Sequence, residues 1–146
     1  MKNIFKLFVL AAIFTSCEDV EPTIFNGTAE EGTFISFSRT TYSLPIERGS
    51  TGTLQIAVNS STVSNLDRTY EIEVLPSNSS SAADPATYSV PGTVTIPAGS
   101  YQGFLTVNGE DLGLVDEEVK KFQIRLNGIT TEYNDQNVAS VNVFEV

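Results

Sequence analysis

From Gly32 onward, apolar and polar residues alternate along most of the chain. A period of two is typical of a β-strand that buries one face, and the spacing of an amphipathic helix is almost absent. We predict a short strand at each alternating segment. The apolar positions of these segments are Ile35 and Phe37; Tyr42, Leu44 and Ile46; Leu54, Ile56 and Val58; Tyr70, Ile72 and Val74; Val94 and Ile96; Leu105 and Val107; Phe122, Ile124 and Leu126; and Val141 and Val143.

Turn-forming residues separate these segments. Asn108-Gly109 and Asn127-Gly128 are predicted to supply positive-φ positions in turns. Pro91-Gly92 and Ala98-Gly99 bound one short strand, and the polar run SNSSSAADPA from Ser77 is predicted to be a loop.

Seven or eight such strands, each with one apolar face to cover, predict an all-β fold with two packed antiparallel sheets. The 146 residues suit one domain, which we place at residues 33–146. Pro45 lacks an amide hydrogen, so its segment is either an edge strand or broken there. The tyrosines and phenylalanines at alternating positions are expected in the core, and the alternative is an exposed binding platform.

The first 32 residues have a different composition. A basic start from Met1 to Lys6 precedes the apolar run LFVLAAIF, and Thr15-Ser16-Cys17 follows, which is the order of a secretory signal. The apolar run is about half of the roughly 20 residues that a membrane-spanning helix needs. Residues 1–16 are therefore predicted to be a signal peptide, and residues 17–32, which are polar and acidic, a flexible tether.

A cysteine directly after small residues at the end of such a run resembles a bacterial lipobox, although Phe14 stands where the common pattern has leucine. The resemblance implies that Cys17 is acylated and anchors the protein to a membrane. A plain signal peptide with an incidental cysteine is the alternative. Glu18, Asp19 and Glu21 resemble the surface-export signal of Bacteroidota lipoproteins, which implies an outer-membrane protein exposed at the cell surface rather than facing the periplasm.

Composition excludes several functions. The chain has 18 acidic and 8 basic residues, a net charge of −10, and loss of Lys2 and Lys6 with the signal peptide would make it −12. This charge opposes binding to nucleic acid and to anionic lipid. Histidine is absent and Cys17 is the single cysteine, so no Ser-His-Asp or Cys-His nucleophile, no zinc site of imidazole or thiolate and no internal disulfide can form. Only paired carboxylates remain for catalysis, and we expect no enzyme.

Three blocks of sequence resemble, in order, the Calx-beta domain. They are FISFSRTTYSLPIERGSTGTLQIAV, SSSAADPATYSVPGTVTIPAGSYQGFLTV and EDLGLVDEEVKKFQIRLNG, and together they span about residues 34–128. The closing strand ASVNVFEV also fits. The resemblance implies a single immunoglobulin-like β-sandwich of the kind found in Bacteroidota lipoproteins.

Some Calx-beta domains bind Ca²⁺ through carboxylates at one end of the sandwich. The resemblance implies that the ligands here would be Glu110, Asp111, Asp116 and Glu117. Two features depart from the pattern, because Thr87-Tyr88 replaces Asp-Tyr and the chain ends Phe144-Glu145-Val146 without an acidic run. Calcium needs six to eight oxygens, so the alternative is a solvated acidic turn and no cofactor.

Two functions follow as hypotheses. The first is a non-catalytic adhesion or accessory module at the cell surface that binds a glycan or a protein partner. The second is a calcium-binding or calcium-stabilised sandwich that uses the acidic turn at residues 110–118.

Overall fold

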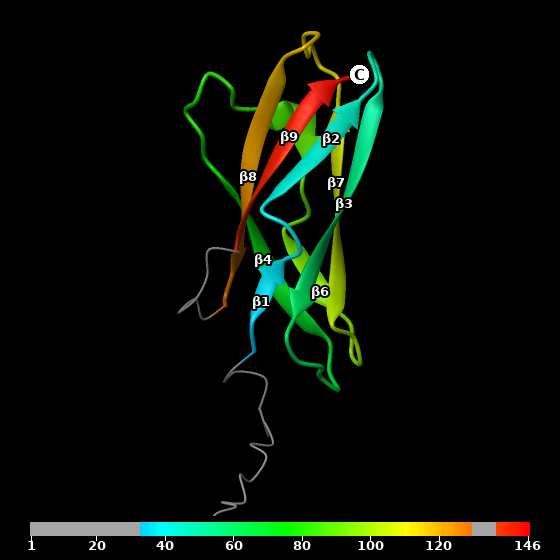
Figure 1. Ribbon diagram of the computed structural model, residues 1–146, viewed down its shortest axis with the longest axis vertical. Helices are drawn as coiled ribbons and strands as arrows, with labels where there is room; N and C mark the ends of the chain where they lie inside the picture. Colours follow the sequence, from blue (N-terminus) through cyan, green and yellow to red (C-terminus); the bar gives the residue numbers. More distant parts are fainter. Residues whose placement is uncertain (1–32, 130–136) are drawn as a thin grey trace, which may run out of the picture.

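The computed structural model describes residues 33–129 and 137–146, which form two β-sheets packed face to face (Figure 1). A single 3₁₀ turn, η1 (Pro85–Thr87), interrupts the strands in these ranges. The strands are β1 (Ile35–Phe37), β2 (Thr41–Ile46), β3 (Thr51–Ser60), β4 (Arg68–Leu75), β5 (Tyr88–Ser89), β6 (Thr93–Ile96), β7 (Gln102–Glu110), β8 (Val119–Asn127) and β9 (Val138–Glu145).

One sheet has four strands in the order β1-β3-β7-β5, and the other has five in the order β2-β9-β8-β4-β6. All neighbours are antiparallel except β2 and β9, which run parallel. The chain changes sheets directly after β1, so its first two strands lie on opposite layers. The predicted all-β sandwich is confirmed. It differs from the prediction in the parallel pairing of β2 with β9 and in β5, a short strand that the alternation did not reveal.

The core lies between the sheets and consists of most of the predicted inward positions. Val74 is an exception, because it is 37% exposed on β4. Leu44, Ile56 and Ile124 are completely buried, and the rings of Tyr88 and Phe122 stack with centroids 3.9 Å apart. The other buried apolar residues are Ile35, Phe37, Tyr42, Ile46, Val58, Ile72, Ala83, Val94, Ile96, Leu105, Val107, Phe122, Leu126, Ala139, Val141 and Val143. Burial of this apolar area is the main stabilising contribution to the fold.

The prediction of a turn at Asn108-Gly109 is wrong, because both residues lie within β7. A Cβ at Gly109 would lie 2.7 Å from Cδ1 of Ile46, so glycine is there to let the two sheets approach. At Gly128 the turn prediction is confirmed, with a φ of 76°. Pro45 lies in β2, which is an edge strand of its sheet. This is the first of the two alternatives that the sequence left open for its segment.

Aromatic side chains divide between the core and the surface. Phe37 and Phe122 are buried as expected, but Phe34, Tyr101 and Phe104 are exposed. The predicted signal peptide, Cys17 and the predicted tether lie outside the described residues. Within the described ranges, no helix has the length and apolar character needed to cross a bilayer.

Candidate functional site

The outward face of the four-stranded sheet is polar but carries almost no charge. β7 alternates strictly, so every second residue from Gln102 to Glu110 points outward and is exposed. β3 presents its own outward residues beside them, in register. The outward residues of this face, which we call the sheet face, are Thr51, Thr53, Gln55, Ala57 and Asn59 on β3, Gln102, Phe104, Thr106, Asn108 and Glu110 on β7, and Ser89 on β5.

Hydrogen bonds across the strands orient the amides of the sheet face. The Thr53 hydroxyl donates to the Asn108 carboxamide oxygen at 3.2 Å, and the Gln102 amide donates to the Asn59 oxygen at 2.9 Å. The amide nitrogen of Asn108 therefore points away from Thr53. A hydroxyl or a carboxamide can both donate and accept, so this surface offers paired donors and acceptors at fixed positions.

Phe104 stands in the middle of the sheet face. Its side chain is 54% exposed, and its neighbour in register on β3 is Ala57, which has little bulk to cover the ring. Gln55 and Thr106 form the next pair along the two strands. An exposed phenyl ring surrounded by amides and hydroxyls provides an apolar platform with polar groups at its rim.

Three hollows lie along the sheet face. The first, of about 290 Å³, lies between η1 with β5 and the outward residues Thr53, Asn108 and Glu110. The second, of about 390 Å³, lies where the crossover from β1 to β2 passes Phe104 and Gln55. The third, of about 560 Å³, is lined by Asn59, Ser60, Ser100, Tyr101 and Gln102.

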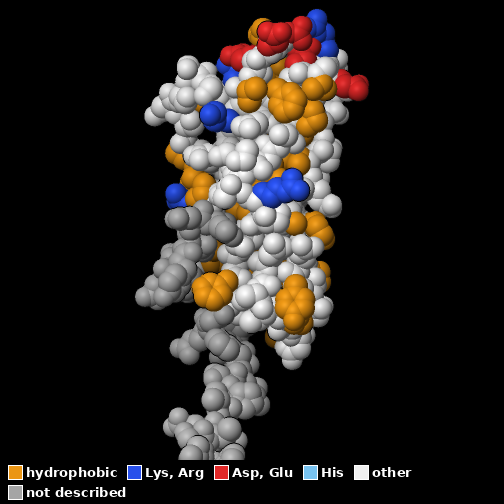
Figure 2. Space-filling view, viewed as in Figure 1, with side chains coloured by type: hydrophobic (Ala, Val, Ile, Leu, Met, Phe, Trp, Pro, Cys, Tyr) orange, Lys and Arg blue, Asp and Glu red, His pale blue; other side chains and the backbone are white. Residues whose placement is uncertain are grey.

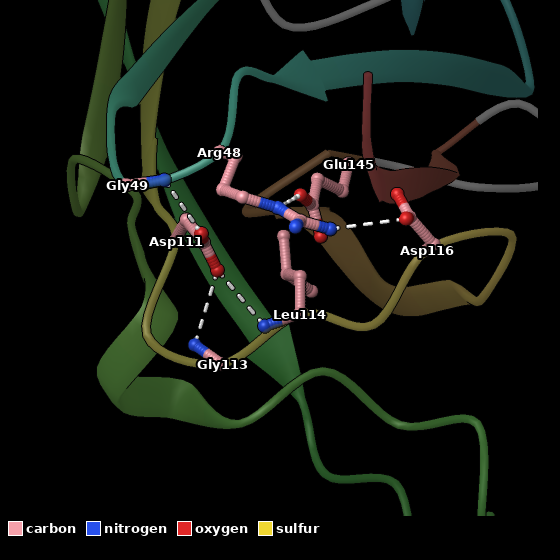
Figure 3. A network of polar contacts seen from close by, with 7 residues as sticks. All are labelled: Arg48, Gly49, Asp111, Gly113, Leu114, Asp116 and Glu145. Atoms are coloured by element: carbon pink, nitrogen blue, oxygen red, sulfur yellow. Dashed lines mark hydrogen bonds and ion pairs between the residues drawn. The ribbon is translucent and has the colours of Figure 1, made fainter.

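Charged side chains, which are scarce on the sheet face, lie at the end of the sandwich where β2, β7 and β9 finish. We call this end the acidic end. In Figure 2, acidic side chains gather there. The carboxylate of Asp111 accepts the backbone N–H groups of Gly49 at 2.7 Å, Gly113 at 3.0 Å and Leu114 at 2.9 Å (Figure 3). The bond from Gly49 is the largest of the causes that lower the pKa of Asp111, followed by those from Leu114 and Gly113.

Arg48 lies at the centre of the acidic end. Its guanidinium pairs with the carboxylate of Glu145, at the end of β9, and with Asp116 in the β7–β8 loop at 3.0 Å (Figure 3). The hydrogen bond to Glu145 is the first cause of the raised pKa of Arg48, and the negative charges of Glu145 and Asp116 add to it. Arg48 thus links the turn after β2 to the end of β9 and to the β7–β8 loop.

The four residues predicted as calcium ligands lie on or next to the β7–β8 loop but are used differently. Asp111 holds backbone amides, Asp116 pairs with Arg48, and Glu110 points outward from the last position of β7. Glu117 has a left-handed backbone with a φ of 65°. In residues 33–129 and 137–146, no three acidic side chains are grouped so as to hold a metal ion. Calcium binding stays a prediction.

Sequence reasoning missed two features. Arg48 and Glu145 are 97 residues apart, and nothing local in the sequence pairs them. The sheet face was visible in principle, because TLQIAVN and GFLTVN alternate apolar residues with Thr, Gln and Asn rather than with charged residues. What could not be seen is that these two segments are neighbours in one sheet.

Solved structures share this fold. A putative carbohydrate binding protein from Bacteroides ovatus matches with a TM-score of 0.61 and 12% identity, over 75% of this chain and 36% of that one. The calcium binding domain CBD12 of CALX1.1 matches with a TM-score of 0.58 and 16% identity, over 77% and 45%. EndoBT-3987 from Bacteroides thetaiotamicron, solved with a Man5GlcNAc product, matches with a TM-score of 0.55 and 12% identity, over 77% and 31%.

The matched region is thus one part of each neighbour, and this chain spans less than half of their lengths. At these identities the matches establish the fold alone: a Calx-beta-like β-sandwich of a kind present in Bacteroides proteins. No protein-family model matches the sequence, and no curated protein matches it.

Proposed function

We propose that this protein is a non-catalytic, lipid-anchored module of the cell surface that binds a neutral glycan on its sheet face. One observation carries the proposal. The exposed Phe104 ring lies among outward Thr, Asn and Gln side chains of β3 and β7, with Glu110 as the one charged residue of the described face. The Bacteroides ovatus neighbour named for carbohydrate binding supports the same class of ligand.

The chemistry of the face suits a sugar better than a charged partner. Sugar hydroxyls both donate and accept, and so do the amides and hydroxyls of Gln55, Thr106 and Asn108. The apolar side of a pyranose ring can lie on a phenyl ring, and Phe104 offers one. Among the described residues, Glu110 is the charged residue of the sheet face and Arg39 borders its second hollow, so this face offers few charges to an ionic ligand.

The proposal is tested by screening a glycan array with the soluble chain from Glu18 onward. The hit is then measured with Phe104→Ala, and with Val115→Ala as the control because Val115 is an equally exposed apolar residue at the acidic end. Loss of the aromatic contact should weaken binding about tenfold, or roughly 1.4 kcal/mol. Equal binding of the glycan by wild type and Phe104→Ala would refute the sheet face as a glycan site. The absence of any glycan that binds on the array would refute it as well.

The anchor and the address rest on the sequence. Cys17 after an apolar run and small residues, followed by Glu18, Asp19 and Glu21, supports acylation and display on the outer membrane. Labelled palmitate should enter the wild-type protein but not Cys17→Ala, and external protease should digest it on intact cells. Label in both proteins, or protection of the intact protein, would argue against the anchor or the surface address respectively.

A further inference from the structure

The end of the sandwich opposite the acidic end exposes a group of apolar side chains. Leu66 is 70% exposed and Tyr101 is 61% exposed, and Phe34 and Val63 are exposed as well. On the face drawn in Figure 2, this lower end shows apolar side chains and no acidic or basic ones. We call residues 33–34, 60–68 and 97–101 the basal end.

Hydrogen bonds hold the three segments of the basal end together. The Ser61 amide donates to the carbonyl of Phe34 at 2.9 Å, and the Ser60 amide donates to the carbonyl of Tyr101 at 2.8 Å. The Gly99 amide donates to the carbonyl of Ser64 at 2.8 Å. The apolar side chains therefore project from one fixed surface rather than from independent loops.

Charge distinguishes the two ends. The acidic end also exposes apolar residues, among them Leu112 and Val115, but Glu110, Asp111 and Asp116 lie in the same segment. In the basal end, the charged residues are Asp67, whose carboxylate accepts the Ala98 amide at 2.8 Å, and Arg68, whose guanidinium donates to the Thr62 carbonyl at 2.7 Å. One negative and one positive group offset each other. Only the basal end can therefore be dehydrated without stripping water from several carboxylates.

The point where the described chain begins indicates what covers this surface. The chain enters the sandwich at Thr33 and Phe34, within the basal end, and sixteen residues separate Cys17 from Phe34 in the sequence. Covalent geometry limits their separation to about 60 Å. An acyl group on Cys17 would keep the point where the chain enters the sandwich, at the basal end, within this distance of the bilayer, and the exposed apolar side chains at that end favour contact with it.

We propose that the basal end rests on a lipid surface, with Leu66, Tyr101, Phe34 and Val63 in contact with it. The inference depends on the proposed anchor at Cys17. It places the long axis of the sandwich upright, because the basal and acidic ends lie at opposite ends of that axis (Figures 1 and 2). The first two hollows of the sheet face then lie along the side of the molecule and remain open to a glycan, whereas the third, lined by Ser100 and Tyr101, lies at the membrane. The carboxylates of the acidic end face away from the membrane.

The chain contains no tryptophan, so a single introduced tryptophan reports its own surroundings. The acylated full-length protein is reconstituted into phosphatidylcholine vesicles with Leu66→Trp at the basal end, or with Leu112→Trp as the matched control at the acidic end. Both positions are exposed leucines in loops. Vesicles with brominated acyl chains should quench Leu66→Trp by at least about twofold more than Leu112→Trp, and the emission of Leu66→Trp should shift to the blue on reconstitution.

Flotation of the same samples separates the two claims. Protein that floats with the vesicles but shows equal quenching at both positions would keep the anchor and overturn the docked basal end. Protein that does not float would refute the anchor and the docking together. A blue shift of Leu66→Trp in the unacylated chain from Glu18 onward, without vesicles, would assign the basal end to self-association and would also overturn the proposal.

Discussion

The guanidinium of Arg48 pairs with the carboxylate of Glu145, which is the last residue of β9. The two side chains differ greatly in exposure, since that of Arg48 is 70% exposed and that of Glu145 only 3%. The pair joins the turn after β2 to the end of β9, beside the hydrogen bond from the Val146 amide to the Ile46 carbonyl at 3.0 Å. The ion pair therefore lies at the end of β2 and β9, the one parallel pair of strands in the described fold.

Replacing Arg48 should destabilise the domain. Arg48→Met leaves the carboxylate of Glu145 covered by protein without its cation, which is more costly than the loss of an exposed pair. A thermal melt at pH 7 should show a midpoint lower by several degrees. Arg39→Met is the control, because Arg39 forms none of the ion pairs found in the described residues. Equal midpoints for the two variants would contradict this role.

Asp111 should stabilise the fold in a pH-dependent way. Its folded-state pKa lies below the ordinary value of about 3.9, so its ionised form is favoured by folding. The contribution is complete above the unfolded-state pKa and is lost as the pH falls through the folded-state pKa. Urea denaturation should therefore show Asp111→Asn less stable than wild type by the same amount at pH 7 and pH 5, and the difference should shrink towards pH 3. Glu110→Gln controls for loss of a neighbouring charge, and a difference that persists unchanged at pH 3 would exclude the charge as its cause.

At Gly103, β7 passes close to the backbone of β6 in the other sheet. A Cβ there would lie 2.4 Å from the backbone oxygen of Thr95, which cannot move as a side chain can. Gly103→Ala should lower the free energy of unfolding by about 1–3 kcal/mol, the range for overpacking a core. At Gly92 an added Cβ meets nothing within 4 Å, so Gly92→Ala should change stability by less than about 0.5 kcal/mol. Similar denaturation curves for the two variants would show that the sheets separate without cost.

Calcium should affect the wild type and an Arg48 variant differently. Asp116 and Glu145 already have a cation in Arg48, so millimolar Ca²⁺ should raise the melting midpoint of the wild type by less than about 1 °C. Arg48→Gln leaves these carboxylates without a counter-charge, and Ca²⁺ should then raise its midpoint measurably. A rise of several degrees in the wild type, reversed by chelator and lost when Glu110, Asp111, Asp116 and Glu117 are neutralised, would instead establish a calcium-binding sandwich.

The alternation of residues was enough to predict most of the strands and most of their buried positions, because burial depends on side-chain order within one segment. It failed at Val74, which is exposed. It did not predict β5, which is two residues long and pairs only with Gly109 and Asn108. It also assigned Asn108-Gly109 to a turn. The dipeptide Asn-Gly occurs in turns, but here its glycine lies beneath Leu44 and Ile46. Only the packing of the other sheet distinguishes these two cases.

The candidate site was harder to predict for a related reason. The acidic residues attracted attention because they are adjacent in the sequence, but in the structure several of them satisfy protein donors. The sheet face joins β3 and β7, whose register is fixed only by folding. No segment by itself shows that Phe104 lies opposite Ala57.

The most direct test is to map the glycan onto the backbone by NMR. The ¹⁵N-labelled chain from Glu18 onward is titrated with the glycan selected on the array, and amide shifts are assigned. We expect the largest changes at Gln55, Phe104, Thr106 and Asn108, on β3 and β7, and none on β4 or β8 of the other sheet. Changes confined to the acidic end or to the five-stranded sheet, with the sheet face unchanged, would contradict the proposed function.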